Sequence, residues 1–220
     1  MVKIGIALTS GGAHALTSIG VLQVLEENGI FPELIAGTSM GAVIGGLYSA
    51  GYSSKNIQSI FKKLNWKEMM DFQIPRAGII AGAKSEHFLR ELFHSKSFKD
   101  LDKKFICVAY NLDKHQSVQL HKGDVTRSVC ASMSVPGYFE PIMINGDRYI
   151  DGMISEPIPI KALKKLKPDI IIASCLRFKE KTEVNPVVRK SVVSEDFLKK
   201  FLEDEINLLE SFLSGKVGKY

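Results

Sequence analysis

This chain of 220 residues is poor in cysteine, and its histidines stop early. Its three cysteines, Cys107, Cys130 and Cys175, form no CxxC pair, which excludes a disulfide-stabilised secreted scaffold and a cysteine-based zinc site. We expect all three to be reduced core residues of a cytoplasmic protein. None of the five histidines follows His121, so the 99 residues beyond it contain no histidine for catalysis or metal binding.

Several sequence motifs that bind nucleotides or metals are also missing. The chain has no GxGxxG dinucleotide loop, no HExxH pair and no complete GxxxxGK[ST] phosphate loop. His87 and His94 lie two turns apart on a predicted helix without a third ligand nearby. We therefore predict no metal ion and no cofactor.

The sequence contains no block of a single charge. A net charge of +5 comes from 29 Lys and Arg against 24 Asp and Glu spread along the chain, so no nucleic-acid arm is expected. Two uncharged runs, 4–25 and 34–54, are long enough to cross a bilayer. Glycine, serine and threonine interrupt both runs, which favours strands, turns and buried helices. The opening MVKIGIALTSGG lacks the features of a secretory signal, so no targeting segment is expected.

Hydrophobic periodicity predicts two consecutive strand, turn and helix units. The strand 3–8 stops at a Thr-Ser-Gly-Gly turn, and helical spacing then continues to Asn28-Gly29. The second unit has a strand at 34–36, a turn at 37–41 and a helix at 42–50. Three further apolar strands, for which we expect burial on both faces, are predicted at 105–110, 117–121 and 170–174. This alternation predicts a layered α/β fold around a mostly parallel sheet.

We divide the chain after residue 176, with one domain at 1–176 and a polar linker from residue 177. Eight apolar residues beyond the linker share one face of a predicted amphipathic helix: Phe197, Leu198, Phe201, Leu202, Leu208, Leu209, Phe212 and Leu213. The sequence does not decide which of three surfaces this apolar face packs against. They are the body of the protein, a partner subunit in a homo-oligomer, and a membrane surface.

Ser39 lies in the sequence Gly37-Thr38-Ser39-Met40-Gly41, between a predicted strand and a predicted helix. A nucleophilic serine on a sharp strand-to-helix turn needs glycines on both sides, because a Cβ would clash with the bent backbone. The helix that follows also directs its positive dipole end toward developing negative charge. This context favours a nucleophile over an ordinary glycine turn.

Two kinds of base could activate this serine. An α/β-hydrolase triad would use His115 or His121 after an upstream aspartate, drawn from Asp71, Asp100, Asp102 and Asp113. However, His115 lies in a predicted hairpin turn and His121 ends a strand. Asp151 follows a short strand and precedes Gly152, and a buried aspartate can act as a general base without histidine. Asp151 is therefore the better candidate.

The loop Ser10-Gly11-Gly12-Ala13 precedes a predicted helix. Backbone N–H groups in such a loop can hold a phosphate or an acyl oxyanion. Because no lysine and serine or threonine follow in the phosphate-loop pattern, the oxyanion is the better interpretation.

These blocks, in this order, resemble the bacterial patatin-like phospholipase family, serine hydrolases with a Ser-Asp dyad. The resemblance covers residues 3 to about 174 and rests on five blocks: ALTSGGAH at 7–14, GTSMG at 37–41, IPRAGIIAG at 74–82, ASMSVPGYFEP at 131–141, and Asp151-Gly152. It implies a three-layer α/β/α fold. It also implies that Ser39 attacks an acyl carbonyl, that Asp151 is its base, and that the amides of Gly11, Gly12 and Ala13 stabilise the oxyanion.

The resemblance implies hydrolysis of phospholipids, lysophospholipids or related acyl esters. Peripheral contact with a membrane surface is compatible with the net positive charge of the chain. Three positions depart from the family pattern: His14 replaces Arg or Lys, Ser10 replaces a glycine, and Met153 replaces a small residue. A catalytically silent lipid-binding or partner-binding homologue therefore stays an alternative. Head group, chain length and the choice between water and another acyl acceptor are left open by the sequence.

Overall fold

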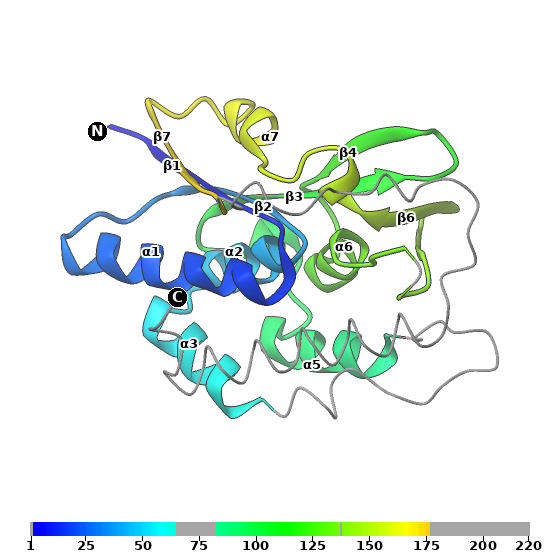
Figure 1. Ribbon diagram of the computed structural model, residues 1–220, viewed down its shortest axis with the longest axis horizontal. Coiled ribbons are helices and arrows are strands. Elements are labelled where there is room, and N and C mark those ends of the chain that lie inside the picture. The colour runs from blue at the N-terminus through cyan, green and yellow to red at the C-terminus, as the bar shows by residue number, and fades with distance from the viewer. Residues whose placement is uncertain (1, 65–81, 137, 177–220) are drawn as a thin grey trace, which may run out of the picture.

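The computed structural model describes residues 2–64, 82–136 and 138–176. A central sheet lies between helices on its two faces (Figure 1). The strands are β1 (Ile4–Leu8), β2 (Leu34–Thr38), β3 (Lys104–Asn111), β4 (Gln116–Leu120), β5 (Ile142–Ile144), β6 (Asp147–Asp151) and β7 (Ile170–Ser174). The α-helices are α1 (Thr17–Glu27), α2 (Met40–Ser49), α3 (Ser54–Lys63), α5 (Ala83–Phe93), α6 (Val125–Ser132) and α7 (Ile160–Lys164). The short 3₁₀ helices are η1 (Gly12–Leu16), η2 (Phe98–Asp100) and η3 (Gly152–Ile154).

The sheet confirms the predicted mostly parallel α/β architecture. Its strands follow the order β5-β6-β3-β2-β1-β7, and β4 pairs with β3 off this path. The neighbours β7, β1, β2 and β3 are parallel, whereas β4 and β6 join β3 antiparallel and β5 pairs antiparallel with β6. Parallel neighbours end at one edge of the sheet, so their C-terminal loops gather there.

The long strand β3 brings two distant parts of the chain together. β2 pairs with its first half and stops at Thr38, opposite Val108. β6 pairs with the next residues and ends at Asp151, opposite Ala109. Because β2 and β6 run in opposite directions along β3, the C-terminal ends of both strands meet at its middle. Ser39 follows one of these ends, and Asp151 is the other.

Two hydrophobic clusters hold the layers together. Alternate residues of β1, β2 and β3 face a large core with α1, α2, α3, α5 and α6. The intervening residues face a smaller core closed by Ala162 and Leu163 of α7. This two-sided burial explains why these strands are continuously apolar in sequence. Figure 1 shows the five helices on one side of the sheet and α7 on the other, which is the three-layer arrangement.

Two expectations about burial were wrong. Among the described residues, β4 and β7 each pair with one strand, and both are partly exposed, so they are not buried on both faces. A strand at the edge of a sheet has fewer packing partners, which hydropathy alone does not reveal. Cys107 and Cys130 are buried as expected, but Cys175 is exposed just beyond β7.

Two predictions lie outside the described residues. They are the linker and amphipathic helix of residues 177–220, and residues 74–81 of the third family-like block. Within the described ranges, no helix combines the length and the apolar character that a bilayer crossing requires.

Candidate active site

Ser39 occupies a strained turn between β2 and α2. Its backbone angles are φ 57° and ψ −127°, a region that residues with a side chain rarely adopt. A Cβ on Gly37 would lie 2.3 Å from the carbonyl oxygen of Gly41, and a Cβ on Gly41 would lie 2.3 Å from that of Leu8. A side chain at either position would therefore clash with the neighbouring backbone. Both positions need glycine because space is lacking, and neither needs it for an unusual φ.

The turn is held in place by Ser132 at the end of α6. The Ser39 N–H donates to Ser132 Oγ at 2.9 Å, and this hydroxyl donates to the carbonyl oxygen of Val108 at 2.6 Å. Ser132 is fully buried. The sequence showed Ser132 only as one residue of the ASMSVPGYFEP block, and the hydrogen bonds explain its place there. It ties the strained serine to β3.

Asp151 ends β6 inside the protein, with no exposed surface. Its backbone N–H donates to the carbonyl oxygen of Ser134 at 2.9 Å, and its Oδ1 accepts the N–H of Met153 at 2.8 Å. Oδ2 is buried and makes no hydrogen bond of normal geometry to any described residue. A buried carboxylate oxygen without a donor is costly and rare, so this atom is a natural candidate for proton transfer.

Burial raises the pKa of Asp151 to about 6. The nearby Ser39 hydroxyl and the N–H of Met153 act in the opposite direction and lower this pKa by stabilising the carboxylate. The Ser39 hydroxyl thus influences the carboxyl group, although it does not complete a hydrogen bond to Oδ2. A carboxyl group with this pKa is ionised at neutral pH, yet it is a stronger base than an ordinary aspartate.

The glycine loop lies beside the Ser39 turn because β1 and β2 are parallel, with Leu8 opposite Gly37. Gly11 has φ 132° and Gly12 has φ 50°, backbone conformations that favour glycine. The N–H groups of these two glycines have no acceptor among the described residues. Ser10 does not adopt a positive φ, so the serine at this position introduces no backbone strain.

A family model described as patatin-like phospholipase matches residues 6–164, well over half of the chain. The chain belongs to the patatin-like phospholipase family. The match includes the glycine loop, the Ser39 turn and Asp151, and it confirms the resemblance inferred from the sequence blocks.

Curated relatives in this family are longer than the chain. Lysophospholipase NTE1 of Candida albicans is 30% identical over 77% of this chain, which covers 13% of that protein. An uncharacterised NTE family protein of Mycobacterium tuberculosis is 32% identical over 81% of this chain, which covers 50% of it. The chain therefore spans half or less of these relatives.

Among solved structures, VipD from Legionella pneumophila shares the patatin-like fold. The two structures superpose with a TM-score of 0.66 at 14% sequence identity, over 78% of this chain and 49% of VipD. At this identity the likeness concerns the fold alone.

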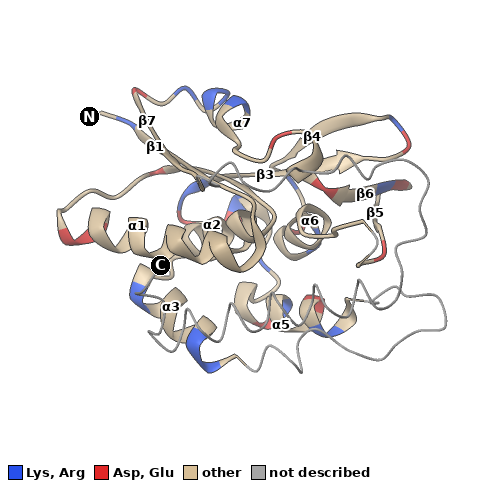
Figure 2. Ribbon diagram, in the orientation of Figure 1, with Lys and Arg blue, Asp and Glu red and all other residues tan. Residues whose placement is uncertain are grey.

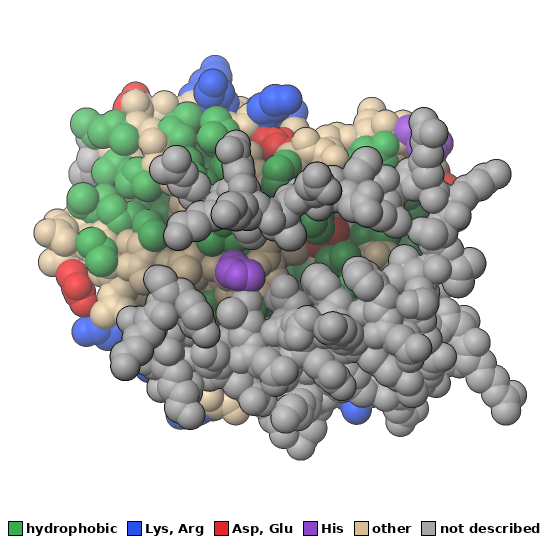
Figure 3. Space-filling model, in the orientation of Figure 1, with side chains coloured by type: hydrophobic (Ala, Val, Ile, Leu, Met, Phe, Trp, Pro, Cys, Tyr) green, Lys and Arg blue, Asp and Glu red, His purple; other side chains and the backbone are tan. Residues whose placement is uncertain are grey.

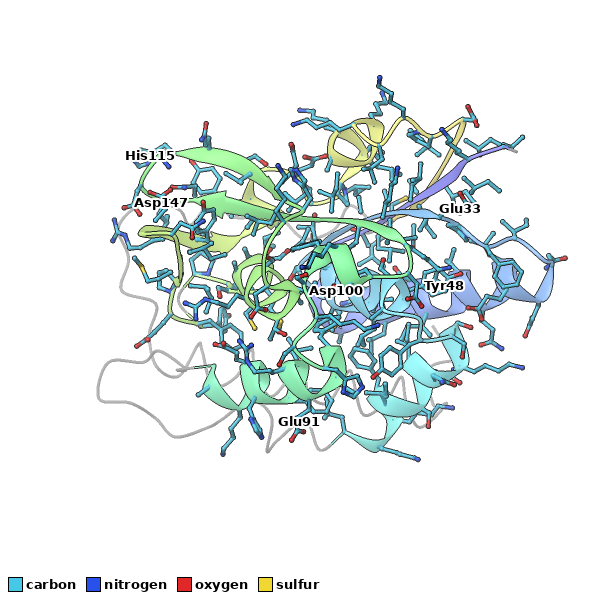
Figure 4. All side chains as sticks on the ribbon, turned by 180° about the vertical axis from the view of Figure 1, so that it is seen from behind. Glu33, Tyr48, Glu91, Asp100, His115 and Asp147 are labelled. Carbon is cyan, nitrogen blue, oxygen red and sulfur yellow. The ribbon has the colours of Figure 1, made fainter. Side chains whose placement is uncertain are left out.

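The histidines of this patatin-like chain do not form a triad around Ser39 within the described residues. His115 lies at the outer end of the hairpin that joins β3 to β4 (Figure 4), and it is exposed. His121 is also exposed, with its Nδ1 3.0 Å from the carbonyl oxygen of Gln119. Asp113 is held by the Arg148 guanidinium at 2.6 Å, which also lowers its pKa. His14, the departure next to the glycine loop, is exposed on η1.

Proposed function

We propose that this chain is a serine hydrolase that cleaves acyl esters of lipids, with Ser39 as nucleophile and Asp151 as general base. The observation that carries the proposal is the meeting of β2 and β6 on β3. It places the strained serine next to a buried aspartate with a raised pKa and an oxygen without a hydrogen bond. Family membership and the lysophospholipase name of a fungal relative support an acyl ester of a lysophospholipid or phospholipid as substrate.

In the first step, Ser39 Oγ attacks the acyl carbonyl carbon while Asp151 Oδ2 takes its proton. The carbonyl oxygen becomes negatively charged and accepts hydrogen bonds from the N–H groups of the loop Gly11, Gly12 and Ala13. When the tetrahedral intermediate collapses, the ester bond breaks and Asp151 returns the proton to the leaving alcohol. The acyl group remains on Ser39.

In the second step, water replaces the alcohol. Asp151 removes one proton from a water molecule while the water oxygen attacks the acyl carbon. The bond between the acyl carbon and Ser39 Oγ then breaks, Asp151 returns the proton to Ser39 Oγ, and the carboxylic acid leaves. One residue serves as base and acid in turn. This requires a carboxyl pKa high enough for the group to accept a proton readily, and burial supplies it.

A fluorophosphonate probe tests the nucleophile directly. We expect labelling of the wild-type protein and none of Ser39→Ala. We expect strongly reduced labelling of Asp151→Asn and full labelling of His115→Ala and His121→Ala.

Hydrolysis of a panel of phospholipids, lysophospholipids and short esters, with Ser39→Ala as the blank, identifies the substrate. Equal labelling of wild type and Ser39→Ala would refute the proposal. Acyl-chain binding without labelling or turnover would instead identify a silent homologue.

A further inference from the structure

Two large apolar side chains are exposed next to the candidate base. Met153 and Ile154 belong to η3, the turn that directly follows Asp151, and 42% and 54% of their surfaces are exposed. Met153 is also one of the positions at which this chain departs from the small residue usual in its family. Two adjacent large apolar residues beside a reaction centre are typical of a surface that meets an apolar partner.

η3 and α7 cover the same face of the sheet. A Cβ on Gly152 would lie 2.4 Å from the carbonyl oxygen of Val108, and the Val108 side chain packs in the small core with Leu163 of α7. The connection between the two elements is fixed because Glu156 Oε1 accepts the N–H of Ala162 at 2.9 Å. Both elements therefore lie on the side of the sheet that carries the small core, and we name their exposed side chains together the η3–α7 face.

The charge on the η3–α7 face is positive. Four exposed lysines lie in and just after α7: Lys161, Lys164, Lys165 and Lys167. None of them forms an ion pair with a carboxylate in the described part of the chain. Of the acidic residues on either side, Glu156 is buried, whereas Asp169 is exposed and accepts the N–H of Lys3, so the four lysines outnumber one exposed carboxylate. Figure 2 shows the basic residues on α7. In Figure 3, which has the same orientation, Lys and Arg side chains project at the top of the molecule beside hydrophobic side chains.

We propose that the η3–α7 face docks the protein onto a lipid surface that contains anionic headgroups. Met153 and Ile154 enter the boundary between headgroups and acyl chains, while the lysines contact phosphate or carboxylate groups. This proposal rests on the proposed function, since η3 directly follows Asp151 and its contact with a lipid surface would bring the candidate base close to lipid esters. It does not depend on the amphipathic segment predicted for residues 197–213.

Vesicle binding tests the proposal without requiring catalysis. The full chain carrying Ser39→Ala is sedimented with phosphatidylcholine vesicles and with vesicles that also contain phosphatidylserine. We expect stronger binding to the anionic vesicles, weakened by added salt. We expect Lys161→Gln with Lys164→Gln to lower the partition coefficient roughly tenfold or more. Met153→Ser with Ile154→Ser should lower it on both kinds of vesicle.

Matched controls lie on the other side of the sheet or on another edge. Lys62→Gln with Lys63→Gln removes two exposed lysines of α3, and Met143→Ser removes an apolar side chain that is 46% exposed on β5. These variants should bind vesicles like the parent. Equal losses in control and test variants, or no binding of the parent to anionic vesicles, would overturn the proposal. Fluorophosphonate labelling of the lysine variants in an otherwise wild-type chain separates this outcome from failure of the proposed function, because labelling needs no lipid surface.

Discussion

The hydroxyl of Ser132 offers the sharpest test of how the Ser39 turn is held. Ser132→Ala leaves the buried N–H of Ser39 without an acceptor and removes the donor to the carbonyl oxygen of Val108. An unsatisfied buried polar group costs about 1–3 kcal/mol. Because the affected N–H belongs to the residue with the strained backbone, part of this cost should appear as a displaced Ser39 hydroxyl.

Ser128→Ala is the matched control, since Ser128 lies on the same helix and is also buried. Its hydroxyl donates to the carbonyl oxygen of Asp124 at 2.9 Å, and that oxygen also accepts the N–H of Ser128. Removing the Ser128 hydroxyl should therefore lower the free energy of unfolding by less than about 1 kcal/mol, because the Asp124 carbonyl oxygen keeps another donor. Both variants remove one hydroxyl from α6, but only Ser132→Ala changes a contact of the candidate nucleophile.

The assays are urea unfolding and hydrolysis of a soluble short-chain ester. We expect Ser132→Ala to lose about 1–2 kcal/mol more stability than Ser128→Ala, and its kcat to fall roughly tenfold while KM stays nearly constant. Ser132→Thr, which keeps the hydroxyl, should recover part of kcat. If Ser132→Ala and Ser128→Ala have the same kcat, Ser132 does not position Ser39 and the reasoning is refuted.

Three further predictions follow from burial. The kcat/KM for a soluble ester should rise with pH and level off above an apparent pKa near 6, because Asp151 must be ionised to act as base; a flat profile between pH 5 and pH 8 would contradict this. Between pH 3.8 and about 6, Asp151 is protonated in the folded protein but ionised in the unfolded chain. The free energy of unfolding of the wild type therefore falls as the pH rises through this range. Asp151→Asn escapes this loss, and its stability relative to wild type should increase by about 1.4 kcal/mol between pH 5 and pH 8 in urea unfolding. Burial also raises the pKa of the Cys107 thiol and raises that of Cys130 to about 12, so a thiol reagent should modify only the exposed Cys175 in the native protein. Rapid reaction of Cys107 or Cys130 would be inconsistent with the buried positions of these two thiols.

The sequence was sufficient to predict the parts of the fold that depend on local patterns. The first two strand, turn and helix units follow from apolar runs that end at glycine turns, and the structure places β1, α1, β2 and α2 within a few residues of the predicted bounds. The family could also be inferred, because several blocks in a fixed order are far more specific than any one glycine-serine turn. The short strand β5 was not predicted, since three residues carry too little periodicity.

The arrangement of the candidate site was not available from local patterns. Ser39 and Asp151 are 112 positions apart in the chain, and no periodicity reveals that β2 and β6 meet head to head on β3. The support from Ser132, the exposed edges of the sheet and the surface shared by η3 and α7 likewise depend on which elements become neighbours.

By itself, the sequence determined which residues could do chemistry and which local turns could hold them, because glycine spacing and hydrophobic periodicity act over a few residues. Only the tertiary structure decided that Asp151 is buried next to Ser39 and has a raised pKa. The physical reason is that desolvation is a property of the surroundings, and packing of distant segments creates those surroundings.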